Sequence, residues 1–416
     1  MTHTDVIIAG GGPSGSLAAY ELARQGISVT LFEKAIFPRY KVCGAGLTHK
    51  ILKEIPFNIE AILETEIHTF TFSSGFKEVF TRYNADPLIY CTMREKLDAF
   101  LLAKAEEAGA KVFFGTRVTD FTQNKDGVEV NTANGLFRTR LLIGADGASA
   151  TVARRAGLRD NIMPGLAWEA EIQTDPSVVK AFSQTVFLDW GTFPGGYGWV
   201  FPKKEHFSIG VGGPAHLSRW MLPYYRQFLG YLEFHLFDRP DLQATGIQRE
   251  EQRLKTLSLK AWPIPVRIKK SRFHDRRVLI AGDAGGLTDP LTGEGIYYAV
   301  RSGKLAAEAC SCYLQAKQQS LQSYSDAVND TLMNELSEAN RIKYIFNTVP
   351  VKIHGFVRDS ERGWRAFGKV LRGERWYGDV GKGLGTWRFL WNPLCTLARF
   401  VSWFKERSFQ KHGFPG

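Results

Sequence analysis

The sequence predicts a mixed α/β protein with a nucleotide-binding α/β part, an inserted antiparallel sheet and a C-terminal helical region. Three observations predict this class. The chain opens with a strand, a glycine-rich turn, a helix and a second strand, and residues 277–314 repeat the strand–turn–helix pattern. Residues 165–260 alternate between apolar and polar positions, and helical periodicity dominates from residue 320 onward. A chain of 416 residues is long enough for two or three such parts.

The first unit has the features of a Rossmann-like nucleotide site. Asp5–Ala9 is predicted as a strand, Ser14–Gln25 as a helix and Ser28–Phe32 as a second strand. The connecting Gly10–Gly15 turn lets backbone N–H groups approach a pyrophosphate, whose charge the helix N-terminus favours. Glu33, at the end of the second strand, can accept hydrogen bonds from ribose hydroxyls and argues against a 2′-phosphate there. The unit therefore predicts a site for FAD or NAD.

The segments that follow are predicted to return to the same sheet. Stretches such as 69–72 within residues 50–85 indicate antiparallel strands, and Arg94–Ala108 has helical periodicity that ends at Gly109. Strands are expected over Val112–Phe121, Val128–Asn131 and Leu141–Gly144. The β-rich stretch 165–260 should carry a helix from about Leu217 to Phe237.

The second glycine-rich unit distinguishes FAD from NAD. A buried strand over Arg277–Ala281 ends in Gly282-Asp283, and Pro290–Gly295 leads into a helix over Gly295–Leu314. This order resembles the second FAD motif of the para-hydroxybenzoate-hydroxylase-like flavoproteins. The resemblance implies that Asp283 binds the ribityl chain and that the helix points its N-terminus at the flavin ring. A helix dipole there stabilises negative charge on the ring.

Two further segments resemble the same superfamily. Gly144–Ser149 followed by Arg154 is similar to its D-G-x-x-S-x-x-x-R motif, although Ala150 stands where the serine is expected. That departure weakens any inference that NAD(P)H binds there. Arg94 resembles the family arginine that contacts FAD.

Two motifs point to a narrower family. Pro38–Gly44 matches the P-x-x-Y-x-x-C-G signature of the geranylgeranyl reductases, and Gly196–Lys203 is similar to their Y-x-W-x-F-P motif. The resemblance covers roughly residues 1–310. It implies that Cys43 lies beside the flavin, and that Tyr197 and Trp199 line a cavity for a lipid chain.

The expected domain boundaries and site residues follow from these motifs. The FAD-binding domain is expected to comprise residues 1–50, 86–160 and 270–318, the β-rich substrate domain 51–85 and 161–269, and the helical basic, aromatic region 319–416. The expected FAD-binding residues are Gly10, Gly12, Pro13, Ser14, Gly15, Glu33, Lys34, Cys43, Gly44, Ala45, Arg94, Val118, Asp146, Gly282, Asp283, Pro290, Gly293, Gly295 and Ile296. The expected substrate-binding residues are Tyr197, Trp199 and Pro202.

Members of this family saturate isolated C=C bonds of polyprenyl chains, so the resemblance implies hydride transfer from the flavin together with protonation of the neighbouring carbon. A thiol is mostly protonated at neutral pH, so Cys43 can supply that proton, with Tyr40 as the competing donor. The electron donor, NAD(P)H or reduced ferredoxin, stays open, as do the prenyl lipid, the number of bonds reduced and the oligomeric state. Two alternatives remain: a flavin-dependent halogenase or aromatic hydroxylase, and a non-catalytic FAD protein that binds lipid.

Charge and aromatic residues concentrate at the C-terminus. Of the net charge of +11, residues 341–416 hold 15 Lys/Arg against 5 Asp/Glu, together with Trp364, Trp376, Trp387, Trp391 and Trp403. This composition favours an anionic membrane surface as partner over nucleic acid, for which no known module is recognised. Asn392-Pro393 is expected to begin a helix with a lipid-facing stripe of Leu394, Leu397, Ala398, Val401 and Phe404, while Arg399 and Lys405 reach headgroups.

The cysteine pattern and the apolar runs bear on the compartment. Five cysteines without metal-type spacing predict a reduced protein with no metal site. The first apolar run leads directly into the Gly10 turn, unlike a signal peptide, and no span of 18 apolar residues indicates a transmembrane helix. We therefore expect a cytoplasmic protein, peripheral on the cytoplasmic face of the membrane.

Overall fold

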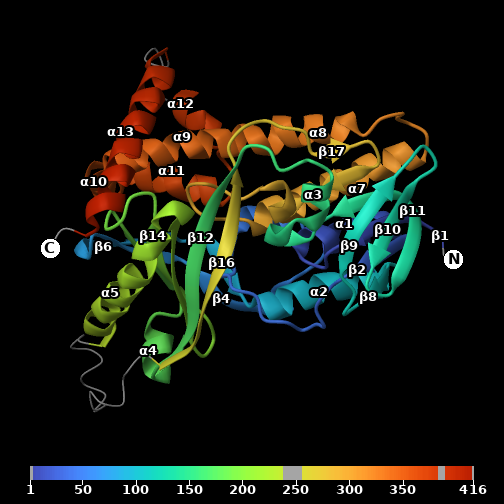
Figure 1. Cartoon of the computed structure of the whole chain (residues 1–416). Helices are drawn as coiled ribbons and strands as arrows, with labels where there is room; N and C mark the ends of the chain where they lie inside the picture. Colours follow the sequence, from blue (N-terminus) through green and yellow to red (C-terminus); the bar gives the residue numbers. More distant parts are fainter. Residues whose placement is uncertain (1–2, 238–254, 383–388, 415–416) are drawn as a thin grey trace.

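The computed structural model describes residues 3–237, 255–382 and 389–414. Its parts lie side by side: a mainly parallel sheet with helices, a long antiparallel sheet, and a layer of C-terminal helices along one side of both (Figure 1). The mixed α/β class, with its Rossmann-like domain and C-terminal helices, is confirmed. Trp387 and parts of the expected substrate and C-terminal domains (238–254, 383–388 and 415–416) lie outside the described residues. Within the described ranges, none of the helices has the length and apolarity needed to cross a membrane.

The first sheet places the nucleotide turns at one edge. Strand β1 (His3–Ala9) lies between β2 (Val29–Phe32) and β11 (Gly135–Gly144), parallel to both. Strand β18 (Val278–Ile280) continues the parallel set beside β11, and β8 (Lys111–Phe113) does so beside β2. The carboxyl ends of β1, β11 and β18 therefore lie together, and a turn that can bind a cofactor follows each.

One expected strand divides in two. Residues 112–121 were predicted as one strand, but the chain turns at Gly115, where φ is +63°. Strand β8 pairs with β2 before the turn, whereas β9 (Val118–Gln123) pairs with β10 (Val128–Thr132) after it. Strand β10 also pairs antiparallel with β11, and β17 (His274–Asp275) pairs with β18 at the edge.

Helices bury the apolar face of this sheet. Helices α1 (Pro13–Ala23), α2 (Arg94–Glu107) and α7 (Ile296–Leu314) pack over it in one hydrophobic core. Helices α1 and α7 approach closely at Gly303, where an added Cβ would lie 2.3 Å from the Ser14 carbonyl oxygen. The short helix α3 (Thr151–Arg155) follows β11.

The second sheet has seven strands and runs in the order β16-β12-β15-β14-β13-β5-β6. All pairs are antiparallel except β13–β5. The strands are β5 (Thr69–Ser74), β6 (Lys77–Tyr83), β12 (Ile162–Gln173), β13 (Thr185–Trp190), β14 (Tyr197–Pro202), β15 (Phe207–Pro214) and β16 (Lys255–Arg267). Helices α4 (Pro176–Ala181) and α5 (Ser218–Phe237) pack on one face. A separate small sheet of β3 (Gly46–Thr48), β7 (Ile89–Thr92) and β4 (Leu63–Ile67) shares a hydrophobic core with β5 and β13.

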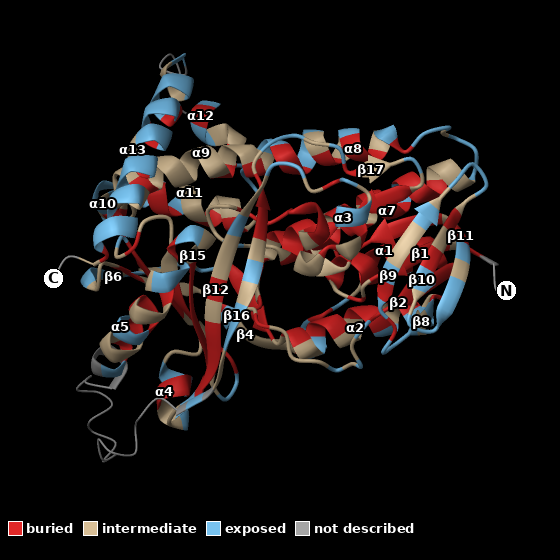
Figure 2. Ribbon diagram, in the orientation of Figure 1, coloured by how far each residue is buried: buried red, intermediate tan, exposed pale blue. Residues whose placement is uncertain are grey.

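The C-terminal region is helical, as expected. It comprises α8 (Gln322–Val328), α9 (Asn334–Thr348), α10 (Pro350–Asp359), α11 (Glu361–Leu371), α12 (Gly378–Lys382) and α13 (Trp391–His412). Pro350 is the first residue of α10, and Pro393 lies in the first turn of α13, where proline removes no intrahelical hydrogen bond. Much of α13 is exposed, whereas the strands beside α1 are buried (Figure 2).

The expected lipid-facing stripe of α13 is partly wrong. Ala398 is buried, because it lies on the helix face that also buries Cys395, Ser402 and Phe409. Lys405 is exposed, and its Nζ donates to the carbonyl oxygens of Asn347 (3.3 Å) and Thr348 (2.7 Å) at the end of α9. Leu394, Leu397 and Phe404 of the expected stripe are exposed, as are Phe400 and Trp403 of the same helix.

Candidate active site

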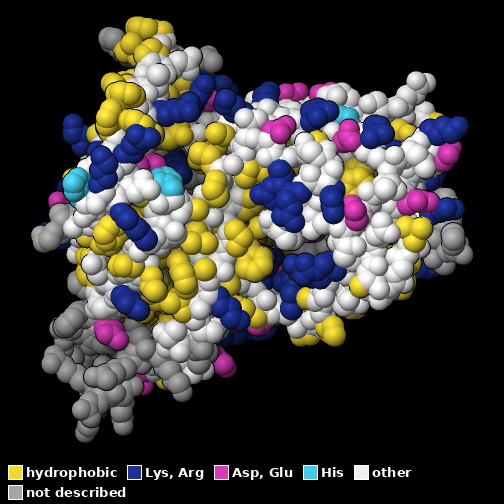
Figure 3. Space-filling view, in the orientation of Figure 1, with side chains coloured by type: hydrophobic (Ala, Val, Ile, Leu, Met, Phe, Trp, Pro, Cys, Tyr) yellow, Lys and Arg dark blue, Asp and Glu magenta, His cyan; other side chains and the backbone are white. Residues whose placement is uncertain are grey.

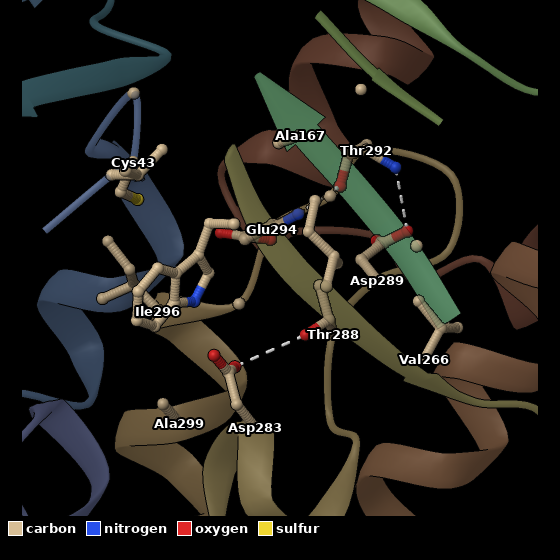
Figure 4. Close-up of a pocket in the computed structure, with 18 of the residues that line it drawn as sticks. Cys43, Ala167, Val266, Asp283, Thr288, Asp289, Thr292, Glu294, Ile296 and Ala299 are labelled. Atoms are coloured by element: carbon tan, nitrogen blue, oxygen red, sulfur yellow. Dashed lines mark hydrogen bonds between the residues drawn. The ribbon is translucent and has the colours of Figure 1, made fainter. Parts of the chain in front are cut away.

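A cavity of about 1050 Å³ lies where the two sheets and the C-terminal helices meet. Most of the predicted site residues line it: Gly10, Gly12, Pro13, Ser14, Glu33, Lys34, Tyr40, Cys43, Gly44, Ala45, Arg94, Val118, Asp146, Tyr197, Trp199, Asp283, Pro290, Gly293, Gly295 and Ile296. Figure 4 shows Cys43 and Asp283, which are far apart in sequence, on the walls of this cavity. The structure thus brings the separate motifs to one place.

Three predicted residues do not line the cavity. Gly15 contacts the end of β1, where an added Cβ would lie 1.9 Å from the Gly10 carbonyl oxygen. At Gly282 φ is +60°, and an added Cβ would lie 2.8 Å from Ser14 Oγ. Pro202 ends β14 and accepts a hydrogen bond at its carbonyl oxygen from Thr65 Oγ1 (3.2 Å). Their contacts are with neighbouring backbone and side chains that support the cavity wall.

The Gly10–Gly15 turn leaves N–H groups at the cavity. Gly12 is the N-cap of α1 and no side chain caps this helix among the described residues, so its first turn presents free donors. Glu33 fixes the turn: its Oε2 accepts from Gly11 N (2.7 Å) and its Oε1 from Ala35 N (2.9 Å). Such a helix start suits a pyrophosphate.

The second and third FAD motifs add further hydrogen-bonding groups without a described partner to the same end of the cavity as the Gly10–Gly15 turn. Gly295, the N-cap of α7, also lacks a capping side chain within the described chain. Asp146 Oδ2 accepts from Val152 N (3.1 Å), but its buried Oδ1 has no hydrogen-bond partner among the described residues. Burial raises the pKa of this carboxyl group. Asp146 Oδ1 is therefore an acceptor available to a hydroxyl or N–H group of a cofactor.

Asp283 stands at the start of the second unit. Thr288 Oγ1 lies 3.5 Å from Asp283 Oδ1, and Ile296 and Ala299 lie close by on α7 (Figure 4). The loop between them is held by Asp289, whose Oδ1 accepts from the backbone N–H groups of Leu291 (2.7 Å) and Thr292 (3.1 Å). The residues at this end, with two uncapped helix N-termini and Asp146 Oδ1, fit a dinucleotide cofactor.

The Cys43 loop crosses from this end to the second sheet. Cys43 N donates to Glu169 Oε1 (2.7 Å), and Ala45 N lies 3.4 Å from Cys43 Sγ. The buried Lys203 donates from Nζ to the carbonyl oxygens of Gly44 (2.7 Å) and Thr92 (2.9 Å). The loop is therefore held in place by a buried carboxyl group and a buried ammonium group.

Arg94 is fixed beside the same loop. Its Nε and Nη2 donate to the two carboxylate oxygens of Asp98 (2.8 and 2.7 Å), and Arg39 Nη2 lies 2.9 Å from Asp98 Oδ2. Burial lowers the pKa of Arg94, but the charge of Asp98 and the neighbouring Cys43 more than offset it, so the pKa lies above its ordinary value. A permanently charged guanidinium group thus lies at the cavity next to Cys43.

Two further titratable groups at the cavity are the Tyr40 phenol and the Glu169 carboxyl group. The Tyr40 hydroxyl is buried without a hydrogen-bond partner in the described part of the chain, and burial together with Glu171 raises its pKa. Glu169 is fully buried, and burial together with Glu171 raises its pKa to about 8. Its carboxyl group is therefore mostly protonated at neutral pH.

Tyr197 and Trp199 lie where the expected substrate motif places them. The Tyr197 hydroxyl donates to the Thr292 carbonyl oxygen, which ties β14 to the loop before α7. Trp199 Nε1 donates to Glu169 Oε2 (3.2 Å), and the Trp199 ring lies over Gly210, where an added Cβ would come within 2.3 Å. Both aromatic rings form part of the cavity wall.

Much of the remaining wall is apolar, and these apolar side chains come from two distant parts of the chain. Strands β5 and β13 contribute Phe70, Phe72, Val186, Leu188 and Trp190, and helices α9 to α11 contribute Phe346, Ile353, Val357, Phe367, Val370 and Leu371. The C-terminal region therefore closes the cavity as well as presenting an exposed surface.

Comparison with known proteins agrees with this geometry. The family model described as an FAD binding domain matches residues 3–188. The geranylgeranyl diphosphate reductase of Rhodobacter capsulatus is 30% identical over 329 residues, which are 75% of this chain and 76% of that protein. The chain belongs to the geranylgeranyl reductase family. It is an FAD-dependent oxidoreductase.

Solved structures show how far the fold of this family extends. A geranylgeranyl bacteriochlorophyll reductase-like protein from Thermoplasma acidophilum has a TM-score of 0.73 at 22% identity, covering 92% of this chain and 99% of that one. A flavin-dependent brominase has a TM-score of 0.69 at 21% identity, covering 89% and 94%. At such identities the likeness concerns the fold alone, so it does not separate reduction from halogenation.

Several polar residues in and beside the cavity wall could not be identified as candidate site residues from the sequence alone. Glu169, Lys203 and Lys50 are buried polar residues, and Lys50 forms an ion pair (2.7 Å) with the half-buried Glu294 on the cavity wall. In Trp168–Ile172, apolar and acidic residues alternate, a pattern typical of a strand with a solvated face. The signal that could have identified Glu169 was the signature of the loop around Cys43, because that loop covers the face to which Glu169 points.

Proposed function

We propose that this protein saturates C=C bonds in the chain of a polyprenyl lipid. The observation that carries the proposal is the continuity of the cavity: it runs from the dinucleotide-binding turns, past Cys43, to a wall of apolar side chains. Burying a prenyl chain against such a wall favours binding by about 0.8 kcal/mol per CH₂ group. FAD supplies a hydride when bound, so chain and reductant can meet within one enclosed space.

The residues around Cys43 have separate tasks in this proposal. The Cys43 thiol donates a proton to one alkene carbon while the neighbouring carbon receives the hydride, and Tyr40 is the alternative donor because its buried hydroxyl is unpaired in the described residues. Arg94 holds its charge beside the loop, and Lys203 fixes the loop backbone. Tyr197 and Trp199 position the chain, and electrons reach FAD from NAD(P)H or reduced ferredoxin.

Reduction is tested anaerobically with protein whose flavin has been reduced by dithionite. Geranylgeranyl diphosphate, menaquinone and a digeranylgeranyl diether in detergent are offered, and mass spectrometry should show a gain of two mass units for each bond reduced. Cys43→Ser should slow this step about 100-fold while the control Cys312→Ser, on α7 outside the cavity lining, does not. No gain in any lipid with reduced flavin would reject the proposal in favour of a non-catalytic lipid-binding protein.

The halogenase or hydroxylase alternative predicts a different dependence on oxygen. Halogenases carry a related W-x-W-x-I-P motif, and here Tyr197 stands in place of its first Trp. If a product forms only when oxygen and a halide are present, and none forms anaerobically, the alternative is correct.

We also propose that α13 docks this enzyme on an anionic membrane surface that holds its substrate. Leu397 and Phe400 are 60% and 59% exposed, and hydrophobic side chains gather on the projecting end where α12 and α13 lie (Figure 3). The Arg407 guanidinium lies 4.2 Å from the Trp403 ring centroid, a pairing of cation and aromatic ring that suits a lipid headgroup region.

Vesicle flotation tests the membrane surface. Leu397→Asp together with Phe400→Asp should weaken binding to vesicles that contain anionic phospholipid at least 10-fold, because two apolar side chains no longer enter the interface. Leu136→Asp is the matched control, since Leu136 is 44% exposed but lies on β11. If wild type, the double variant and Leu136→Asp all float equally with the vesicles, α13 has no role in membrane binding.

A further inference from the structure

Polar side chains extend from the cavity along β12 toward the turn between β14 and β15. Glu169 and Glu171 lie two residues apart on β12, so their side chains point to the same face of the sheet. Both are buried, with 0% and 8% exposure. Two carboxyl groups on one buried face are costly unless at least one of them is neutral.

Glu169 is the innermost of these side chains. It lines the cavity, accepts from Cys43 N (2.7 Å) at Oε1 and from Trp199 Nε1 (3.2 Å) at Oε2. Burial and the charge of Glu171 raise the pKa of Glu169 to about 8, so the group can both hold and release a proton near neutral pH.

Glu171 and His206 form the outer part. Glu171 Oε2 accepts from Ser208 Oγ (2.6 Å) on β15 and lies 3.0 Å from His206 Nε2. His206 belongs to the turn between β14 and β15, and its side chain is 20% exposed. The imidazole therefore lies against the buried Glu171 carboxyl group while part of its ring is exposed to solvent.

Other charged and titratable groups also face Glu169. Lys203, at the end of β14, lowers the pKa of Glu169 but is itself bound to two carbonyl oxygens. Lys260, the neighbour of Glu169 on β16, directs its ammonium group over the Tyr40 ring (4.6 Å). Burial raises the pKa of the Tyr197 phenol, and the charges of Asp289, Cys43 and Glu169 raise it further. Burial also raises the pKa of the Tyr225 phenol, together with the charges of Glu169 and Glu171. Both phenols are therefore neutral at physiological pH, so Glu171 and Lys203 are the charges that bear most on Glu169.

We propose that Glu169 stores the proton that replaces the one given up at Cys43, and that His206 and Glu171 return it from solvent. This inference rests on the proposed alkene reduction. It assigns the three residues to a relay that acts through Cys43, because the Glu169 carboxyl group is bound to the backbone of that residue.

The relay balances protons and electrons. Reduced FAD, when bound, would supply the hydride for one alkene carbon and would be left oxidised. The S–H bond of Cys43 breaks as a C–H bond forms at the other carbon, leaving a thiolate. The O–H bond of Glu169 then breaks to restore the thiol, and its carboxylate takes a proton from protonated His206 through Glu171. One solvent proton is consumed for each C=C bond reduced.

The test compares the first turnover with later turnovers in protein whose flavin is reduced by excess dithionite, with the prenyl lipid used in the reduction assay. Glu169→Gln keeps the acceptor for Cys43 N but cannot carry a proton. It should leave the first turnover at neutral pH within about 3-fold of wild type and slow later turnovers about 100-fold. The decline of the wild-type turnover rate above pH 8 should be absent in the variant.

Two further variants separate the relay from a structural role. His206→Gln should slow later turnovers about 10-fold and recover when imidazole is added, while Glu233→Gln, an exposed position on α5, should match wild type. FAD content, read from flavin absorbance, should be the same in all variants. Wild-type turnover and an unchanged pH profile in both Glu169→Gln and His206→Gln would overturn the proposal.

An infrared titration keeps the proposal independent of the lipid assay. The difference between wild type and Glu169→Gln should contain a protonated carboxyl band that disappears near pH 8. If no lipid is reduced but the band is present, the proposed function fails, although Glu169 is still a buried acid that titrates near pH 8. If lipid is reduced but the band is absent at pH 6, Glu169 is already ionised and the relay is wrong.

Discussion

The two ends of the cavity are built from different kinds of sequence. At the FAD end, each wall segment is a short local motif, in which a strand, a glycine turn and a helix N-terminus follow one another within about fifteen residues. At the apolar end, the wall joins β5, β13 and helices α9 to α11, which lie up to 300 residues apart. We therefore expect cofactor binding to be sensitive to single positions, and the proposed lipid binding to depend on the shape of a composite surface.

Asp283→Ala tests the first half of this comparison and should have the largest effect. A carboxylate that accepts hydrogen bonds from a bound cofactor contributes about 1.5–3 kcal/mol for each bond, so FAD affinity should fall about 100-fold. Flavin absorbance after dialysis, together with a binding titration, measures the loss. Asp330→Ala is the control, because Asp330 is an exposed carboxylate paired only with Lys270 among the described residues. If FAD affinity is unchanged, Asp283 has no role in holding the cofactor.

Leu188→Trp tests the second half of the comparison, which concerns the apolar end of the cavity. Leu188 lines the apolar end on β13, and an indole there occupies space that a lipid chain would use. We expect affinity for a geranylgeranyl chain to fall at least 10-fold, because part of the chain loses burial at about 0.8 kcal/mol per CH₂ group. FAD affinity should stay the same, and a shorter, geranyl chain should lose less. Equal losses for FAD and lipid would show that the two ends are not separable.

The sequence predicted most of the residues that line the cavity around the glycine-rich turns. The turns at Gly10 and Asp283 reached the expected cavity because their conformation depends on neighbours in sequence. Even so, Gly15 and Gly282 turned out to support the wall through close packing, a distinction that depends on the third dimension. The division of residues 112–121 at Gly115 depends likewise on which neighbouring strand each half pairs with.

The apolar end of the cavity could be predicted only in part. The Tyr197–Trp199 motif was recognisable, but apolar residues such as Phe367 and Leu371 look like ordinary core residues until α11 is placed beside β5. Composition alone assigned the C-terminal region to a membrane surface, and its inner face proved to close the cavity. Glu169 was missed because an alternating strand looks solvated when the loop that covers it is unknown.

The pH dependence of stability in Glu169→Gln is the smallest effect expected in this comparison, and it concerns the point where the two ends meet. The Glu169 carboxyl has a pKa of about 8 in the folded protein against an ordinary value of 4.5, so between these values only the folded state holds the proton. Stability therefore falls as pH rises through this window and levels off above about pH 8. Between pH 7 and pH 8 the wild-type free energy of unfolding should decrease by about 1 kcal/mol relative to that of the variant, by urea titration. All other titrating groups are common to both proteins and cancel in the difference. A constant difference across pH 6–9 would mean that Glu169 does not titrate there, and Cys43 would then need another source for its proton.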